Sequence, residues 1–499
     1  MDTKDLVETN EGGFSKWRLR LWPLHRNEAK KFFPLWLMKC AMSFVFTILH
    51  ATKDTVIVTS IDGGVESIPV LKGGFVLFFS FIFILIYSKL SNHLSRTNLF
   101  YATFIPFIIF FALYGFFLYP NREWLTPTES ADWLLSYLGK ERGHWVVCYR
   151  HWIDSIFFLM AELWGAVVIV LLFWGYANRI NTVREASRSY TLLSAGSHIG
   201  VIVAGPLIWH FSSALAGEQF GVTIQYLMSL VTGAGLLILG VYWWMNRFAV
   251  HDEAASDPAQ VKAATKLSLW DSLRHLAKSP SLRYIALMVI GYSASVNMVE
   301  VVWKATLKLQ YPNSSDYQAF MGIISSIVGV VSLLIALFVG GNVIRKFGWY
   351  AGALLTPMVL GIVSILFLGV YFFYDLSGIP LLAGSTALML LVMCGATHNV
   401  ACKSMKYCLF DPTKEMAYIP LDEESKVKGK AAVDVVASRF GKSGSSWIQI
   451  AFMEIAGVSS VFSIVPYLAP CILIGVIGWF ISVRALSQNF AAPAKQAKS

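Results

Sequence analysis

The amino-acid sequence predicts an all-α membrane protein of about twelve transmembrane helices in two six-helix halves. Hydrophobic residues make up 56% of the 499 residues and charged residues only 14%, whereas about a quarter of the residues in soluble domains are charged. Apolar runs of about 20 residues, the length that crosses a bilayer, recur along the whole chain. One long polar stretch separates these runs into two equal sets.

The expected spans follow one another with mostly short polar connections. In chain order they are 33–60, 68–90, 99–119, 145–177, 190–211, 223–250, 282–309, 320–343, 350–374, 379–408, 431–455 and 461–483. The predicted regions are a cytoplasmic segment 1–32 with an amphipathic interfacial stretch at 14–24, a bundle 33–250, a cytoplasmic linker 251–281, a bundle 282–486 and a cytoplasmic tail 487–499.

Basic residues between the spans predict the orientation. Connections after even-numbered spans carry many Lys and Arg, and those after odd-numbered spans carry almost none outside one longer loop at 120–144. Because cytoplasmic connections are rich in Lys and Arg, both termini are expected in the cytoplasm. The N-terminus has no cleavable signal pattern. Two six-helix halves joined by a cytoplasmic linker are the outline of a major-facilitator-like transporter, in which cargo binds near mid-membrane.

Ionisable residues inside the spans are the functional candidates, because a charge at mid-bilayer costs about 3 kcal/mol on insertion scales. They are Lys53, Asp54, Lys72, Asp154, Glu162, Glu300, Lys304, Lys403, Lys406, Lys442 and Glu454. Lysines converging from several helices suit a phosphate-rich cargo. The alternatives are private ion pairs, Lys53 with Asp54 or Glu300 with Lys304, and extension of Lys72 toward lipid headgroups.

Other chemistries lack their motifs. The six cysteines form no C-x-x-C pair, and Cys394, His398 and Cys402 along one helix face are interpreted as packing residues, so no metal and no cofactor are expected. Gly441-Lys442-Ser443 fails as a phosphate-binding loop because Val436 stands where that motif needs glycine. The net charge of +10 lies mainly between apolar blocks, so no nucleic-acid partner is expected. Because the motifs of a soluble enzyme are missing, no enzyme activity is expected either.

Several blocks of the chain resemble the ATP/ADP translocase family of nucleotide transporters from plastids and obligate intracellular bacteria such as chlamydiae. The similar blocks are 52–59, 68–72, 87–92, 161–165, 173–178, 297–304 and 410–434. The resemblance implies nucleotide import from a host, by exchange for ADP or by proton-coupled net uptake, across the inner membrane of an intracellular bacterium. It implies functional charges at Lys72, Glu162, Glu300 and Lys442.

Two adjacent positions depart from the pattern of the exchangers. Where they read Leu-Arg-Asp-Thr-Lys-Asp, this chain has His50 and Ala51 in place of the Arg-Asp pair. A histidine can cycle protons near neutral pH, so proton-coupled uptake of nucleoside triphosphates by a monomer among membrane lipids is expected. Nucleotide exchange, or transport of a sugar phosphate or dinucleotide, are the alternatives, and packing is the alternative role for His50.

The predicted site combines both lines of reasoning. Residues expected to bind substrate are Lys53, Lys72, Glu162, Asn178, Glu300, Lys304 and Lys442. Residues expected to couple transport to the driving ion are His50, Asp54, Glu162 and Glu300.

Overall fold

A computed structural model describes residues 28–60, 64–181, 183–215, 219–249, 274, 276–382, 384–421, 433 and 437–496. Within these residues the chain forms helices and no strands, which confirms the predicted all-α class. The predicted amphipathic stretch 14–24, most of the linker 251–281 and the end of the tail lie outside the described residues.

The first half of the chain begins with a 30-residue helix and contains several helices that continue through a wider π-helical turn. Its elements are α3 (Ala29–Val58), α4 (Ser67–Val70), η1 (Leu71–Phe75), α5 (Val76–His93), α6 (Arg96–Leu113), η2 (Tyr114–Leu118), α7 (Arg122–Leu125), α8 (Thr128–Leu138), η3 (Lys140–Arg142), α9 (Gly143–Arg150), α10 (Trp152–Trp164), η4 (Gly165–Phe173), α11 (Trp174–Ile180), α12 (Val183–Ala214), α13 (Phe220–Trp244) and η5 (Met245–Ala249).

The second half is built in the same way. Its elements are α16 (Pro280–Gln310), α17 (Ser314–Ile335), η6 (Ala336–Gly340), α18 (Gly341–Leu376), α19 (Thr386–Met405), η7 (Lys406–Phe410), α20 (Asp411–Met416), α21 (Ser438–Ala456) and α22 (Val461–Gln496). Below, the N-terminal half means residues 29–249 and the C-terminal half means residues 280–496.

Eleven helices in the described part of the chain are long and apolar enough to cross a membrane. The eleventh predicted span, 431–455, corresponds to α21, which starts later and is more polar. Arg439, Lys442 and Gln449 lower its hydropathy, and Gln449 is buried. A helix with buried polar side chains can pack in the bundle like the other spans although its hydropathy is too low for it to be recognised as one.

Two predicted spans begin in apolar sequence seven residues before their helices. The fourth span was expected to start at Trp145, but the helix breaks at His151, whose ψ is 47°, and α10 starts at Trp152. The tenth was expected to start at Ile379, but α19 starts at Thr386 behind the N-cap of Ser385. In both places an apolar run extends beyond the helix, because aromatic and aliphatic residues also occupy the connections.

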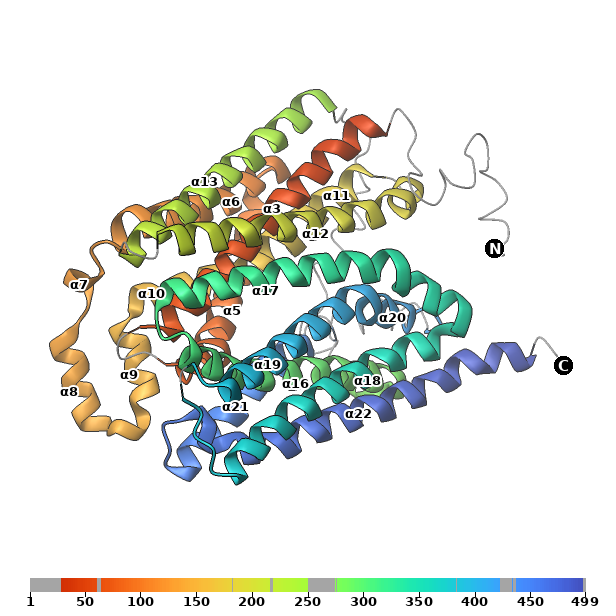
Figure 1. Ribbon diagram of the computed structural model, residues 1–499. Helices are drawn as coiled ribbons and strands as arrows, with labels where there is room; N and C mark the ends of the chain where they lie inside the picture. The colour runs from red at the N-terminus through yellow and green to blue at the C-terminus, as the bar shows by residue number, and fades with distance from the viewer. Residues whose placement is uncertain are drawn as a thin grey trace.

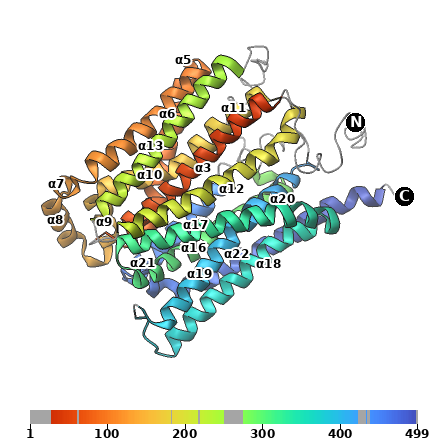
Figure 2. The same cartoon turned by 45° about the horizontal axis from the view of Figure 1, so that its top comes forward.

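The two halves pack along α12 and α17, which run side by side in Figures 1 and 2. Small residues permit the approach: a Cβ at Gly322 would lie 2.8 Å from the carbonyl oxygen of Gly205 and 2.9 Å from the backbone nitrogen of Trp209. Backbone atoms cannot move aside, so this crossing requires glycine.

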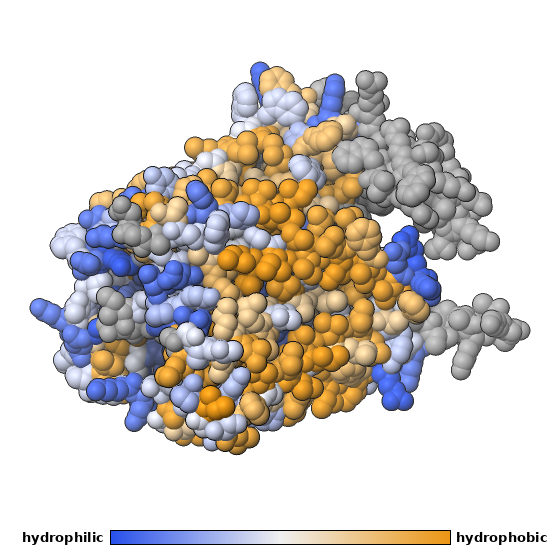
Figure 3. Space-filling model, in the orientation of Figure 1, coloured by the Kyte–Doolittle hydropathy of each residue, from blue (hydrophilic) through white to orange (hydrophobic). Residues whose placement is uncertain are grey.

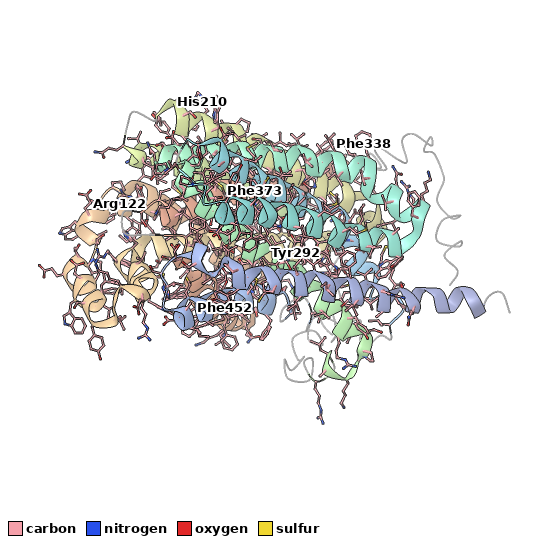
Figure 4. The ribbon with its side chains drawn as sticks, turned by 60° about the horizontal axis from the view of Figure 1, so that its bottom comes forward. Arg122, His210, Tyr292, Phe338, Phe373 and Phe452 are labelled. Carbon is pink, nitrogen blue, oxygen red and sulfur yellow. The ribbon has the colours of Figure 1, made fainter. Side chains whose placement is uncertain are left out.

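The end of the bundle away from both termini, called the distal end, carries the extra helices α7, α8 and α9 (Figure 1). Polar surface lies at this end, next to a broad apolar band over the bundle (Figure 3). Figure 4 places Arg122 at the distal end and Tyr292 inside the C-terminal half. Tyr292 packs there against Phe410 at 4.9 Å and Trp479 at 5.8 Å between ring centroids.

Contacts between the halves also join the distal end. Thr59, after α3, and Ser314, at the start of α17, share a hydrogen bond of 2.7 Å. The backbone N–H of Val461 donates to Glu66 at 3.2 Å. Glu454 of α21 accepts hydrogen bonds from Arg142 Nε at 3.0 Å and Trp145 Nε1 at 3.3 Å. In this conformation the halves are therefore joined at the distal end.

Candidate functional site

A chain of ion pairs crosses the interface between the two halves. It starts at Glu162 on α10, whose Oε1 lies 3.0 Å from Lys53 Nζ on α3. Lys53 also pairs with Asp54 at 2.8 Å. Asp54 Oδ2 then reaches Lys304 Nζ of α16, in the other half, at 2.8 Å. Positive and negative groups alternate along this chain, and each charge has an opposite partner.

The same series of ion pairs crosses the interface between the two halves a second time. Lys304 lies 3.4 Å from Glu300, one helical turn before it. Glu300 Oε2 lies 3.3 Å from Lys72 Nζ on η1, back in the N-terminal half, and Glu300 Oε1 lies 3.8 Å from Lys403 on α19. Seven of the eleven predicted charges thus meet in one network, called the ionic cluster below, and the predicted private pairs Lys53–Asp54 and Glu300–Lys304 are links of it. Asp154, Lys406 and Glu454 have other partners: Tyr114, Asp411 and Arg142.

Burial divides the ionic cluster into an inner and an outer part. The side chains of Lys53, Asp54 and Lys304 are fully buried, with 0% exposure. The partly accessible members are Lys72, Glu162, Glu300 and Lys403, with side-chain exposures between 10% and 28%. Ligand access in this conformation is therefore confined to the outer part, and the inner part joins the halves.

Lys442 of α21 completes the outer part, and within the described residues it has no direct ion pair. Its side chain is exposed, and its charge and that of Lys72 both act on Glu162. Lys406 and Arg439 also lie within electrostatic range of Lys442. The ionic cluster with Lys442 contains five lysines against three acids, so it has an excess of positive charge.

Local structure positions Lys72. This residue lies in the π-helical turn η1, and Gly73 and Gly74 follow it. Gly73 permits close packing against α21, because a Cβ there would lie 3.1 Å from Ser446 Cβ. Trp447 Nε1 donates to the Gly73 carbonyl at 3.1 Å. The wide turn and the glycine together bring the lysine up to the opposite half.

Sequence reasoning missed Asn297 as a site residue. Lys72 Nζ donates to Asn297 Oδ1 at 2.9 Å, and the Asn297 amide donates to Ser445 and Ser446 at 3.0 and 3.2 Å. The signal was present, because residues 297, 300 and 304 recur at spacings of three and four and share one helix face.

Gln318 of α17 was also missed. Its amide donates to Thr52 Oγ1 at 3.0 Å, and its carbonyl oxygen accepts from the Thr55 hydroxyl. Gln318 is fully buried and links α17 to the α3 turn that carries Lys53 and Asp54. A lone glutamine in an apolar run carries no sequence pattern, so its partner in the other half could not be predicted.

His50 lies beside the inner part. Its ring stacks on Phe46 at 5.2 Å, and among the described residues its Nδ1 has no hydrogen-bond partner. One nitrogen of His50 and carboxylate oxygens of Asp54 and Glu300 lie within 4.8 Å of one another. Such a triad has the ligand types of a metal site, but the Lys304 ammonium already lies against both carboxylates and would repel a cation.

Asn178 stands apart from the ionic cluster. It is exposed on α11 and accepts a hydrogen bond of 2.6 Å from the Tyr190 hydroxyl. Sixteen residues separate it from Glu162 along a nearly continuous helix, which corresponds to roughly 20 Å of rise. Any role of Asn178 in binding therefore concerns a different part of the ligand from the part near Glu162.

The fold and the ionic cluster define a class: a multi-pass membrane transporter with a charged site between two helical halves. The structure is similar to a bacterial homologue of the iron transporter ferroportin (TM-score 0.56, 12% identity, 95% of this chain and 100% of that chain). It is also similar to a bacterial homologue of the human lysosomal transporter Spinster (TM-score 0.51, 12% identity, 93% and 99%). At these identities the likeness shows the fold alone.

Sequence comparison identifies the family. The profile of the TLC ATP/ADP transporter family matches residues 7–490, and the chain belongs to that family. ADP,ATP carrier protein 1 of Chlamydia muridarum is 43% identical over 98% of this chain and 93% of its own length. The chloroplastic ADP,ATP carrier protein 1 of Arabidopsis thaliana is 40% identical (92% and 74%), and ADP,ATP carrier protein 1 of Rickettsia prowazekii is 35% identical (96% and 97%). This confirms the resemblance, and the family is one of transporters rather than enzymes.

Proposed function

We propose that this protein carries nucleotides, foremost nucleoside triphosphates, across the inner membrane by alternating access, with uptake coupled to protons. The single observation that carries the proposal is the ionic cluster, which joins the halves through Asp54–Lys304 and Lys72–Glu300. A membrane protein does not keep such charges between moving parts without a use for them. The ADP,ATP carriers among the relatives support a nucleotide as the cargo.

The outer part of the ionic cluster has the chemistry to bind phosphate. Lys72, Lys403 and Lys442 are the accessible cations, and ammonium groups bind phosphate as point charges. A triphosphate entering between the halves competes with Glu300 for Lys72 and Lys403, which Glu300 holds at 3.3 and 3.8 Å. Substrate binding therefore weakens a contact between the halves at the moment when the carrier must change conformation.

The inner part suits the role of a coupling element. Lys53, Asp54 and Lys304 are buried in this conformation, and separating the halves would break the pair between Asp54 and Lys304. With the distal end facing outward, as the distribution of basic loops predicts, the conformation described here is closed to the outside. Asp54, Glu162 and Glu300 then hold the closed state until cargo and driving ion change their pairing.

His50 is the proposed proton-binding residue. One nitrogen of His50 lies within 4.8 Å of carboxylate oxygens of Asp54 and Glu300, and among the described residues its Nδ1 has no hydrogen-bond partner. A proton on His50 would give these two carboxylates a further cationic neighbour beside Lys304 and would change the balance of the cross-interface pairs. Titration near neutral pH is the ordinary behaviour of histidine, and this position links a proton to the part of the site that joins the halves.

Uptake into proteoliposomes tests the proposal. Purified protein is reconstituted with an empty interior or with internal ADP, and labelled ATP is added with and without an outside-acid gradient. The proposal predicts uptake into empty vesicles that the gradient accelerates. Uptake only into ADP-loaded vesicles would instead establish nucleotide exchange, the second candidate, which the names of the relatives favour.

The same assay addresses other phosphorylated cargoes. Unlabelled sugar phosphates and dinucleotides are added as competitors, since the ionic cluster recognises phosphate and not a base. Competition by a sugar phosphate equal to that by ATP, or no transport of any nucleotide under either condition, would contradict a nucleotide carrier.

A further inference from the structure

Lys39 on α3 is a buried lysine without an acid. It is 5% exposed, and its ammonium lies 5.0 Å from the ring centroid of Phe173 and 5.1 Å from that of Trp174. Among the residues that the structure describes, no carboxylate and no hydrogen-bond acceptor pairs with this ammonium. Lys53 and Lys304, the other deeply buried lysines of the spans, each contact two carboxylates.

The aromatic rings alone do not account for this charge. Contact with a ring face attracts a cation, but it offsets only part of the cost of placing an ammonium away from water. Within the described part of the chain, no carboxylate acts on Lys39 electrostatically. The surroundings of Lys39 therefore favour the reversible binding of an anion that is not part of the protein.

Lys39 is the eleventh residue of α3, and α3 starts at the end of the bundle where both termini are (Figure 1). Fourteen residues separate it from Lys53 on the same helix, which is four turns, about 21 Å, and nearly the same helix face. Lys39 is therefore on the α3 face that leads to the ionic cluster, on the side of that cluster opposite the joined distal end.

Groups from both halves surround this level of the bundle. The charge of Lys39 acts on His198 of α12, and the His198 ring lies 6.2 Å from the ring of Tyr407 in the C-terminal half. Lys406 Nζ lies 4.7 Å from the same Tyr407 ring, and Asp411, at 2.9 Å from Lys406, is the acid of this group.

Uncharged hydrogen-bonding groups adjoin the aromatic side of this group. Trp174 packs against Tyr190 at 5.0 Å between ring centroids, and the Tyr190 hydroxyl bonds Asn178. The arrangement offers cations, a hydroxyl and an amide, while its acid is already paired with Lys406. These are groups that bind a phosphate-bearing solute and repel a cation.

We propose that Lys39 is a second phosphate-contacting residue, which binds nucleotide phosphate between the ionic cluster and the cytoplasmic end. This inference rests on the proposed function and adds to it a separate contact about four helical turns from Lys53. The nucleotide meets Lys39 on its way out of the site, or extends to it while bound.

The test compares phosphate charge rather than overall activity. Purified full-length protein and the variant Lys39→Met are titrated with ATP, ADP and AMP, and the ligand-induced rise in melting temperature gives each affinity. Methionine keeps the length and the aromatic contact but removes the charge. We expect the affinity loss to be largest for ATP, on the order of tenfold, smaller for ADP and smallest for AMP, because the attraction grows with phosphate charge.

Two further variants serve as controls. Lys31→Met removes a positive charge from the same helix, at a residue with 34% side-chain exposure that pairs with Glu185 at 3.7 Å, and its affinities should equal those of the parent protein. Lys39→Arg keeps the charge and should keep the ranking of the three nucleotides. If Lys39→Met does not fold, Lys39→Gln replaces it in the same series.

The outcomes separate this inference from the proposed function. If the parent protein binds and transports nucleotides but Lys39→Met has unchanged affinities, or the same loss for all three ligands, Lys39 has a packing role and the inference is wrong. If the parent protein neither binds nor transports any nucleotide, the proposed function itself fails.

Discussion

Lys72 shows how one residue depends on both halves of the molecule. Its helix contributes the wide turn and the two glycines, while Asn297 and Glu300 of the other half hold its ammonium at 2.9 and 3.3 Å. Lys72 therefore contacts the C-terminal half only while the halves are close. If a phosphate replaced Glu300 as the partner of Lys72, the Lys72 ammonium would depend less on contact with the C-terminal half.

Replacing Lys72 by glutamine should weaken ATP binding without unfolding the protein. A hydrogen bond to a charged group contributes about 1.5–3 kcal/mol, so the affinity should fall roughly 10- to 100-fold. Glutamine can still bond Asn297. Titration of purified protein with ATP measures the effect, and Lys89→Gln, an exposed lysine of α5, is the matched control. Unchanged affinity in Lys72→Gln would remove Lys72 from the binding site.

The buried pair Asp54–Lys304 should behave in the opposite way, as a structural link. Asp54→Asn leaves Lys304 and Lys53 with one acid each, and breaking a buried pair costs about 3–5 kcal/mol. The double variant Asp54→Asn, Lys304→Met removes both charges and should recover most of the lost melting temperature. Equal losses in the single and double variants would mean that the pair does not join the halves.

Of the candidate site, the charged residues could be predicted from the sequence, but their partners could not. A lysine or glutamate inside an apolar run stands out because its burial is costly. That Lys53 pairs with Glu162, and Asp54 with Lys304, depends on the packing of helices more than one hundred residues apart. Uncharged amides are tolerated in membrane spans, so their presence does not by itself indicate a site. Asn297 and Gln318 were therefore not predicted.

At the scale of elements, apolar runs predicted the helices well and their ends less well. The break at His151 and the late start of α19 fall within apolar sequence, where hydropathy gives no boundary. α21 is the clearest case: it buries Ser443, Ser445, Ser446 and Gln449, and Ser445 and Ser446 accept hydrogen bonds from Asn297. Hydropathy therefore identifies most of the spans and underrates this one, whose buried face is polar.

The crossing of α12 and α17 should be intolerant of any side chain at Gly322. Alanine there meets backbone atoms at 2.8 and 2.9 Å, so the helices must separate, and overpacking costs about 1–3 kcal/mol. We expect Gly322→Ala to lower the melting temperature by several degrees and to slow transport. Gly233→Ala on α13 is the control, since a Cβ at Gly233 would have no neighbouring atom within 4 Å. If both variants have the melting temperature and transport rate of the parent protein, α12 and α17 pack less closely at this crossing than described.

The joined distal end should respond to Glu454. This carboxylate accepts from Arg142 and Trp145 of the N-terminal half, and it is 30% exposed. Exposed pairs contribute about 0.2–1 kcal/mol each, so Glu454→Ala should raise distal opening about two- to fivefold. Labelling of a cysteine at Thr59 with a membrane-impermeant maleimide measures opening, with Glu415→Ala in the C-terminal half as control. Unaltered labelling would show that Glu454 is not part of the closure.

His144 makes the same closure sensitive to pH. Burial lowers the pKa of His144 below its ordinary value, and the nearby Glu454 offsets part of that effect. Since the pKa is lower when the distal end is joined than when His144 is in water, protonation favours the open state. Maleimide labelling at Thr59, divided by the labelling rate of a free thiol at the same pH, should therefore rise as the pH falls through about 6.5. In His144→Gln this rise should disappear; a rise that persists there must come from another group.

At the scale of the whole molecule, the ionic cluster links the closed distal end to the path toward the termini. The inner ion pairs join the halves, and the outer lysines are the proposed phosphate contacts. Lys39 lies farther along the same face of α3. In the proposed mechanism, substrate charge, proton binding at His50 and closure at Glu454 all act on this interface. Each of them can bias the same rocking motion of two halves.

We propose that nucleotide phosphates bind between the halves at the outer lysines. A cryo-electron microscopy map of the purified protein with ATP would show where the phosphates lie. We expect triphosphate density within hydrogen-bond distance of Lys72 or Lys442, with the Lys72–Glu300 contact lengthened beyond its present 3.3 Å. ATP density elsewhere, with Lys72 still paired to Glu300 and Lys442 unoccupied, would contradict it.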